Sequence, residues 1–323
     1  MHWGVDSWGP ADGHVSAPEA LQRAGDPYDG ITLFELVARR MGRAPAFWGR
    51  YLNRRLPEDR RTGAVRSPEH SHAITPREIE FLHNNGCRAL LVYNGGAGRE
   101  HRLRGGMHAG REAAERADAL ADQLGVPPHV VIYGDIENWP GNVGWFRGWF
   151  ETMRAAGRRC GVYGRPIRVV ENPADPSPTY GTALDHIPSR YTRELATRMI
   201  DEETRRTHRA PRRVTTHDYW SSDLRRALAD ALVDGVIEHS VDPFTSDQFY
   251  VWSSEPRRVL SAGSDADLDG SDIPTEFVPA EPPHAATVRT VVWQYLENAI
   301  HNGGAHGAVD MNLADDTGFA TMW

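Results

Sequence analysis

The sequence contains no lysine, and all 36 of its basic residues are arginines. Catalysis through a lysine Schiff base and phosphate binding by a P-loop lysine are therefore excluded. Cysteine is nearly absent too. Cys87 and Cys160 form neither a CxxC motif nor a metal-ligand pattern, so we expect both to be reduced and buried in the core. The sequence also lacks the GxSxG motif of serine hydrolases.

Long hydrophobic runs and basic stripes are missing as well. No segment approaches the roughly 18 consecutive apolar residues that span a bilayer, so no transmembrane segment is predicted. The first residues, MHWGVDSWG, show no charged segment followed by an apolar one, and no signal peptide is visible. We therefore expect a cytoplasmic protein as the chain is written, or an extracellular or cell-envelope protein if another route exports it. The net charge is 36 − 44 = −8, and nucleic acid is not expected as a partner.

The sequence does contain an alternation of short apolar segments with amphipathic ones. Strands are expected at His2–Asp6, Ala46–Leu52, Ala89–Asn94, Val130–Glu137, Cys160–Gly164, Phe249–Ser253, Val291–Tyr295 and Ala308–Asn312. Helices are expected at Ile31–Met41, Pro76–Asn85, Gly110–Leu124 and Val143–Ala156. This alternation predicts an α/β fold of parallel strands with helices outside, and eight strands favour a closed, TIM-like barrel. An open doubly wound sheet is the alternative, although no GxGxxG follows the first strand.

Local signals mark the ends of two helices. Thr75 precedes Pro76, and Glu78 follows three residues after the threonine, which predicts a capping box. Gly86 and Gly157 stand where a helix would end on a left-handed residue.

Two segments interrupt the regular spacing within what we interpret as a single barrel domain over residues 1–323. Residues 166–247 are too many for one crossover and show helix patterns at 189–208 and 222–233. We therefore expect a helical insertion after the fifth strand. Residues 257–287 are rich in Gly, Pro, Ser and Asp, and we expect a long acidic surface loop there.

Two carboxylates one residue apart end the fourth predicted strand, in VVIYGDIE. Asp135 and Glu137 would point to the same face, with Tyr133 below them, because side chains alternate along a strand. In a parallel barrel the carboxyl ends of the strands form the active-site mouth. Neighbouring anions in a partly desolvated pocket ionise one after the other, which yields the proton donor and the anion that glycoside cleavage requires. The spacing is compatible with several carboxylate separations, so the stereochemical outcome stays open.

Other predicted strand ends carry acidic, amide and aromatic residues. Asp6 ends the first strand, and Asp310 and Asn312 end the eighth. Carboxylates handle hydroxyl groups and protons, and aromatic faces stack on sugar rings. The candidate substrate-binding residues are Tyr93, Tyr133, Tyr163, Trp252, Trp293, Tyr295 and Asn312.

These strand ends carry a resemblance to a known family. GVD in the first strand, DIE in the fourth, VWQY in the seventh and VDMN in the eighth resemble the family 25 glycoside hydrolases, the Chalaropsis-type lysozymes. The segments FWGRYL, ALLVYNGGAG and AGREAAERADALADQLGVPPHVVIYGDIE are similar to a related actinobacterial domain, the glycoside-hydrolase-like domain of unknown function numbered 1906. The resemblance covers residues 1–165 and 288–313 and leaves out the insertion.

The resemblance implies a fold and an activity. Family 25 folds as a barrel of five β/α units followed by three strands, a (β/α)5(β)3 variant, and cleaves the β-1,4 bond between amino sugars of peptidoglycan. It implies that Glu137 is the general acid and Asp135 its assisting carboxylate, with Asp6 and Asp310 as flanking carboxylates of the cleft. The expected partner is peptidoglycan or another amino-sugar glycan. A carbohydrate-binding protein of the cell envelope that keeps the barrel without turnover is the alternative.

The segment DADLDGSDIPTE matches a calcium-loop pattern through Asp265, Asp267, Asp269, Gly270 and Glu276. Against a calcium site, Asp272 stands where an apolar residue normally joins the paired loop, Pro274 lies within the segment, and neither flank has a helical pattern. We favour a solvated acidic loop and expect no required cofactor, with a calcium-dependent module as a third hypothesis.

Overall fold

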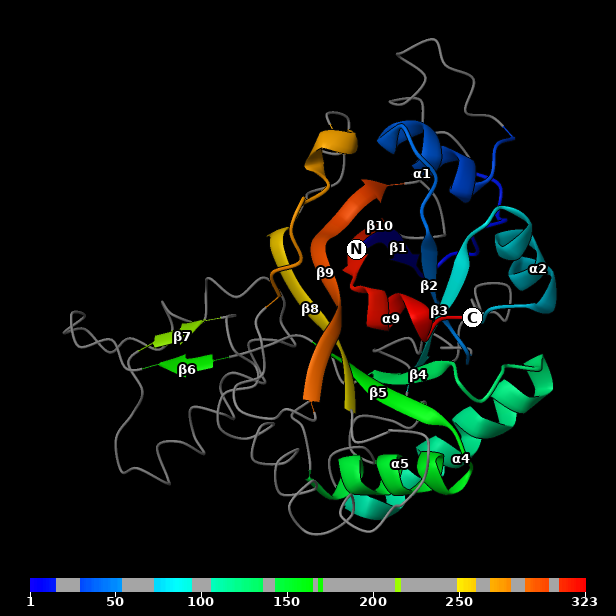
Figure 1. Cartoon of the computed structure of the whole chain (residues 1–323), viewed down its shortest axis with the longest axis vertical. Coiled ribbons are helices and arrows are strands. Elements are labelled where there is room, and N and C mark those ends of the chain that lie inside the picture. The colour runs from blue at the N-terminus through cyan, green and yellow to red at the C-terminus, as the bar shows by residue number, and fades with distance from the viewer. Residues whose placement is uncertain are drawn as a thin grey trace, which may run out of the picture.

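The computed structural model of the protein describes residues 1–15, 30–53, 73–94, 106–135, 143–164, 168–170, 213–215, 249–259, 268–279, 288–301 and 308–323. Eight strands close into a barrel in the order β1-β10-β9-β8-β5-β4-β3-β2 (Figure 1). They are β1 (His2–Ser7), β2 (Phe47–Tyr51), β3 (Arg88–Asn94), β4 (Val131–Asp135), β5 (Arg159–Gly164), β8 (Phe249–Val259), β9 (Val288–His301) and β10 (Ala308–Ala314). Each overlaps one of the predicted strands. The TIM-like barrel is thus confirmed, and the open doubly wound sheet is excluded.

The last strand departs from the predicted parallel arrangement. The other seven strands run parallel to one another, whereas β10 pairs antiparallel with both β9 and β1. Only residues 302–307 separate β9 from β10, and a parallel crossover needs a dozen residues or more. Because β10 is reversed, its first residues lie beside the carboxyl ends of the other strands.

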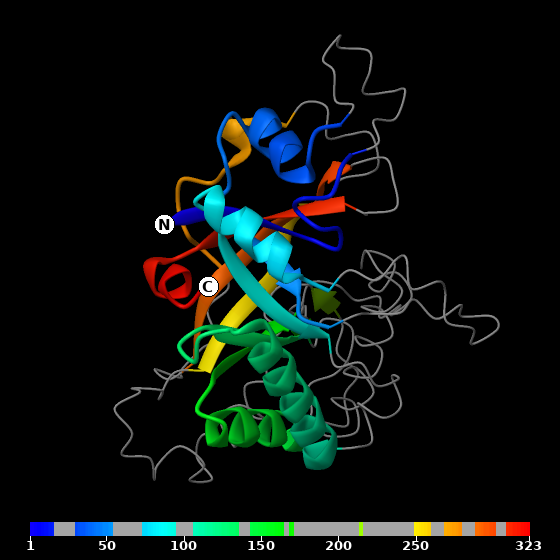
Figure 2. The same cartoon turned by 90° about the vertical axis from the view of Figure 1, so that its right-hand side faces the viewer.

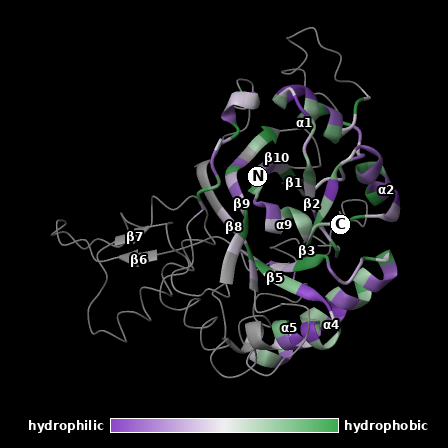
Figure 3. Ribbon diagram, in the orientation of Figure 1, coloured by the Kyte–Doolittle hydropathy of each residue, from purple (hydrophilic) through white to green (hydrophobic). Residues whose placement is uncertain are grey.

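Helices follow the first four strands: α1 (Leu33–Met41), α2 (Pro76–Asn84), α4 (Gly106–Leu124) and α5 (Val143–Ala155). Hydrophilic residues gather on these helices, and the strands are mainly hydrophobic (Figure 3). The positive φ angles of Gly86 (68°) and Gly157 (74°) confirm the predicted left-handed helix ends. The capping box of α2 is only half formed. The Thr75 hydroxyl accepts from the Glu78 N–H, but the Glu78 carboxylate binds a buried arginine, described below.

Alternation of side chains divides the core into two layers. One apolar cluster lies between the strands and the helices, and a second fills the barrel itself. Cys87 and Cys160 are buried free thiols, as expected, and burial raises the pKa of both.

The C-terminal segment closes one end of the barrel. Ala89, near the start of β3, exchanges both backbone hydrogen bonds with Trp323, and the N–H of Val131 at the start of β4 donates to the carbonyl of Thr321. The helix α9 (Asp316–Ala320) and both termini lie at this end (Figure 2). The mouth at the carboxyl ends of the parallel strands is therefore the opposite end.

The insertion separates two neighbouring strands, because β5 ends at Gly164 and pairs directly with β8, which begins at Phe249. Within it, β6 (Arg168–Val170) and β7 (Arg213–Thr215) form a two-stranded antiparallel sheet. The helices predicted at 189–208 and 222–233 lie outside the described residues. In the predicted acidic loop, the part at 268–279 contains a short 3-10 turn, η5 (Gly270–Asp272). None of the helices in the described ranges has the length and apolar character needed to cross a membrane.

Candidate functional site

Two carboxylates, Asp6 of β1 and Asp310 of β10, face each other at the mouth of the barrel. They are direct register partners, and such partners in antiparallel strands have Cα atoms about 4.5–5.5 Å apart and side chains on the same face. A Cβ built on Gly49 of β2 would lie 2.5 Å from Asp6 Cβ, so the glycine leaves room for the Asp6 side chain inside the barrel. Both carboxylates are half-buried. Two neighbouring anions therefore meet at one end of the barrel.

An amide side chain fixes the Asp6 carboxylate. Asn312 Nδ2 donates to Asp6 Oδ1 at 2.6 Å, and Asn312 Oδ1 accepts from the indole Nε1 of Trp252 at 2.9 Å. An indole N–H can only donate, so the Asn312 oxygen must face Trp252 and its NH₂ group must face the carboxylate. The arrangement joins β8, β10 and β1 across the barrel.

A second amide holds Asp310 in the same way. Gln294 Nε2 donates to Asp310 Oδ2 at 2.7 Å, and the Tyr163 hydroxyl donates to Gln294 Oε1 at 2.8 Å. This contact series joins β5, β9 and β10. Each of the paired carboxylates therefore accepts an N–H donor, which stabilises its negative charge.

Asp135 ends β4 beside a third amide. Asn94 Nδ2 donates to Asp135 Oδ2 at 2.8 Å, and the N–H of Asn94 donates to Asn53 Oδ1 at 2.9 Å. Asp135 is only 6% exposed. Glu137, the predicted general acid, lies outside the described residues.

The predicted position of Tyr93 in the cleft is wrong. Its ring lies 6.1 Å from that of Trp149 on α5, in the layer between strands and helices, and burial raises its pKa. Side chains alternate along β3, so the inward position at this strand end belongs to Asn94, not to Tyr93.

The predicted positions of Trp293 and Tyr295 in the cleft are wrong for the same reason. Both belong to the apolar cluster between the strands and the helices. There the Trp293 ring packs edge-on against Phe277, with ring centroids 6.4 Å apart, and lies 5.8 Å from the Tyr295 ring. Gln294 between them takes the inward position. The sequence VWQY identified the right strand and the wrong face.

Tyr133, Tyr163 and Trp252 do lie inside the barrel, below the carboxylates. The Trp252 ring contacts Tyr163 at 4.3 Å and Tyr133 at 6.0 Å between centroids, and it is 1% exposed. Burial raises the pKa of Tyr133, as do Tyr250 and Asp315, which belongs to the closed end. These three rings form the floor of the mouth, where Tyr163 holds Gln294, Trp252 holds Asn312, and Tyr133 packs against Trp252.

Sequence reasoning missed an aromatic pair at the rim. Trp8 stacks on Tyr51 of β2, with ring centroids 4.8 Å apart and an interplanar angle of 27°. Trp8 is partly exposed and packs against the cluster inside the barrel. The signal was its position two residues after Asp6, which continues the inward face of the first strand.

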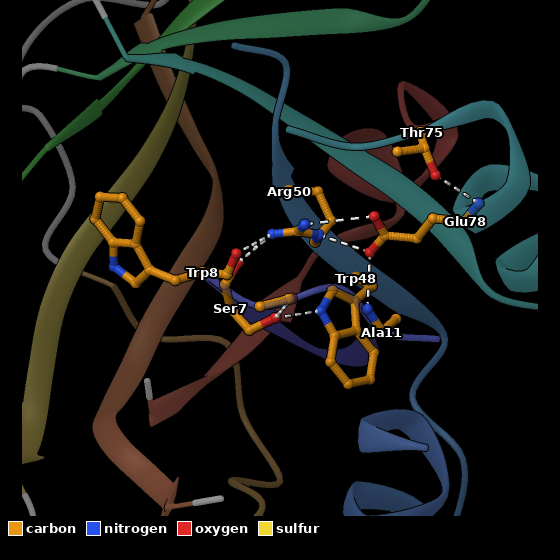
Figure 4. Close-up of polar contacts among 8 residues, drawn as sticks. Ser7, Trp8, Ala11, Trp48, Arg50, Thr75 and Glu78 are labelled. Atoms are coloured by element: carbon orange, nitrogen blue, oxygen red, sulfur yellow. Dashed lines mark hydrogen bonds and ion pairs between the residues drawn. The ribbon is translucent and has the colours of Figure 1, made fainter. Parts of the chain in front are cut away.

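A fully buried ion pair lies behind this rim (Figure 4). Arg50 Nε donates to Glu78 Oε1 at 2.6 Å, and both side chains are 0% exposed. Arg50 Nη1 also donates to the carbonyls of Ser7 (2.8 Å) and Trp8 (2.7 Å), and Glu78 Oε1 accepts the N–H of Ala11 at 2.8 Å. The pair therefore ties the segment after β1 to β2 and α2.

The calcium pattern falls partly outside the described residues, which do not include Asp265 and Asp267. Asp269 caps the 3-10 turn by accepting from the Ser271 N–H at 2.7 Å, a contact that lowers its pKa, and Glu276 is exposed. Within the ranges that the structure describes, no group of three or more acidic, histidine or cysteine side chains is arranged to hold a metal ion.

We expect Asn312→Leu to lower the free energy of unfolding by about 1–3 kcal/mol, because the buried Trp252 N–H would lose its acceptor. Urea unfolding followed by circular dichroism measures the change. Asn84→Leu, at an exposed position of α2, is the matched control and should stay within about 0.5 kcal/mol of the parent. Equal stabilities for the two variants would contradict the assigned role of Asn312.

The family model described as "Rv2525c-like, glycoside hydrolase-like domain" matches residues 45–227, more than half of the chain. The chain belongs to this family. The Rv2525c-like assignment supports the glycoside-hydrolase-like part of the resemblance found in the sequence and does not extend to family 25. A comparison with curated proteins finds no match.

A comparison with solved structures finds further similarities. An uncharacterized protein of B. stearothermophilus is 22% identical over 100% of both chains, with a TM-score of 0.52, which shows the fold alone. The Mycobacterium tuberculosis Tat-secreted protein Rv2525c, solved in complex with HEPES, is 15% identical with a TM-score of 0.44, covering 100% of this chain and 98% of that one. The same protein in complex with L-tartrate is 14% identical with a TM-score of 0.44, covering 98% of this chain and 96% of that one.

Proposed function

We propose that this Rv2525c-like protein is a glycoside hydrolase of muramidase type, which cleaves β-1,4 bonds in peptidoglycan or a related amino-sugar polymer. The observation that carries the proposal is the facing pair of Asp6 and Asp310, each held by an amide donor at the barrel mouth. The DIE sequence begins at Asp135, the last residue of β4, and its resemblance to the family 25 strand ends supports the same interpretation.

In the proposed reaction Glu137 gives its proton to the glycosidic oxygen as the bond from that oxygen to the anomeric carbon breaks. Positive charge then develops on the sugar ring. Asp135, as the assisting carboxylate, and the flanking Asp6 and Asp310 supply negative charge that stabilises it. Water adds to the anomeric carbon, and its proton returns to a carboxylate. The amide donors keep the carboxylates in place, so they need not reorganise as charge appears.

A second candidate is a carbohydrate-binding protein of the cell envelope that keeps this barrel without turnover. The favouring observation is that Asp6, Asp135 and Asp310 each accept a hydrogen bond from an amide side chain. A fixed array of carboxylates and amides is suited to holding sugar hydroxyl groups as well as to catalysis.

The test is incubation of the purified chain with purified peptidoglycan, followed by mass spectrometry of the soluble fragments. We expect muropeptides with new reducing ends at one type of amino sugar, and none with the heat-unfolded chain. Saturable binding without fragments would favour the carbohydrate-binding candidate. If the chain neither releases fragments nor binds the glycan, the proposal of an amino-sugar ligand is overturned.

A further inference from the structure

The partly exposed indole of Trp8 stands next to the paired carboxylates. It follows Asp6 by two residues, packs against the barrel interior and stacks on Tyr51 at the carboxyl end of β2. Tyr51 is itself 9% exposed, so the stack sits where the floor of the mouth meets its rim. Of the aromatic residues predicted to bind substrate, the three on the inward face of the barrel are 4% exposed or less. Trp8 therefore offers aromatic surface one inward position beyond Asp6.

The backbone of Trp8 is held from behind by a buried arginine. Its carbonyl accepts from Arg50 Nη1 at 2.7 Å, as does that of Ser7 at 2.8 Å, and the guanidinium is fully buried against Glu78. A buried ion pair loses much of its Coulomb attraction to desolvation, so it is weak evidence for stability as such. Here the guanidinium donates to the carbonyls of Ser7, the last residue of β1, and of Trp8, which follows it.

The orientation of Trp8 is consistent with a positioning role for Arg50 and Glu78. In Figure 4 the Trp8 ring points away from the Arg50–Glu78 pair, while the Trp8 backbone points toward it. The Ser7 side chain is also engaged, since Ser7 Oγ accepts from the Trp48 indole at 2.8 Å. The segment after β1 is thus anchored on the side that faces the helix layer and presents the Trp8 ring to the mouth.

We propose that Trp8 is a platform for a pyranose ring of the glycan and that Arg50 and Glu78 are positioning residues that hold it. The class of ligand rests on the proposed function. A sugar ring stacked on this indole would bring its hydroxyl groups beside Asp6 and Asp310. An aromatic side chain fixed before binding loses little conformational entropy on binding, which favours affinity.

The experiment is calorimetric titration of the full chain with a soluble oligomer of β-1,4-linked N-acetylglucosamine. Trp8→Leu keeps apolar bulk without a ring, and we expect it to raise the Kd about 10-fold or more, the scale of an aromatic hot spot. Trp8→Phe keeps a ring and should stay within about 3-fold. Trp323→Leu, at the closed end of the barrel, is the matched control and should bind like the parent.

The outcomes separate this inference from the proposed function. No binding by the parent chain would count against the amino-sugar ligand and so against both. Parent-like binding by folded Trp8→Leu would overturn the platform and leave the proposed function standing. If Trp8→Leu fails to fold, Trp8→Phe and Trp8→His carry the comparison, because histidine offers a smaller polar ring and should bind more weakly than phenylalanine.

The positioning role has its own readout. Arg50→Lys keeps the charge but loses the fork that reaches Glu78 and both carbonyls at once. We expect it to weaken binding about 3-fold to 10-fold when Trp8 is present and not at all in the Trp8→Leu background. An equal loss of affinity in both backgrounds would show that Arg50 does not act through Trp8.

Discussion

Glutamine in place of Glu137 is expected to lower the rate of glycan cleavage by about 10²–10⁴-fold, the usual contribution of a general acid. The amide of glutamine has nearly the shape of the carboxyl group but carries no proton that it can give to the glycosidic oxygen. The bond must then break with an unprotonated leaving group. Release of reducing ends from purified peptidoglycan, measured over time, gives the rate.

The control for this variant is Glu115→Gln, which makes the same chemical change on the exposed face of α4. It should cleave at the parent rate, and the far-ultraviolet circular dichroism of both variants should match the parent. Binding of the oligomer by Glu137→Gln should persist, because the amide still offers hydrogen bonds. Cleavage by Glu137→Gln at the parent rate would remove this residue from the role of general acid and leave the fold assignment untouched.

The strands of this barrel were predictable because each contains a short, mainly apolar run. Helix signals were as informative, since Thr75, Gly86 and Gly157 act within a few residues of themselves. The direction of β10 is a different kind of property. It depends on the length of the connection after β9, and the predicted end of that strand at Tyr295 left six further strand residues, up to His301, uncounted.

The site was predictable in its carboxylates and less so in its neighbours. Asp6 was found because an acid is conspicuous near the end of an apolar strand. Asp310 was predicted at the end of the eighth strand, but it lies near the start of β10, and the reversed direction of β10 brings it to the mouth. The faces of the aromatic residues were not found, because one position of error along a strand moves a side chain from the barrel interior to the helix layer. Gln294 shows the consequence, since the amide between Trp293 and Tyr295 binds Asp310.

The Arg50–Glu78 pair was invisible for a further reason. Arg50 lies on β2 and Glu78 on α2, and the sequence around either residue gives no indication of its partner. Glu78 even matches a local motif, the capping box, whose side-chain contact is replaced by the long-range one. Local rules fail here because the buried guanidinium requires a counterion, and this demand outweighs a helix cap of about 1 kcal/mol.

The second large effect follows from that pair. Arg50→Met should lower the free energy of unfolding by about 3–5 kcal/mol, because the fully buried Glu78 carboxylate would lose its counterion. The double variant Arg50→Met with Glu78→Leu removes both charges and should be more stable than the single variant. Urea unfolding of the parent and both variants measures the difference. The dependence of the unfolding free energy on urea concentration should be the same for all three, so that a shift in the midpoint reports a change in stability.

An ion pair with an exposed arginine supplies the matched control for this prediction. Arg77 contacts Asp12 at 3.3 Å with its side chain 83% exposed, and Arg77→Met should cost at most about 1 kcal/mol. A double variant less stable than Arg50→Met would mean that losing the Glu78 side chain, with its hydrogen bond from the Ala11 N–H, costs more than the uncompensated charge does. The contrast between Arg50 and Arg77 thus separates what burial does to an arginine from what the arginine itself contributes.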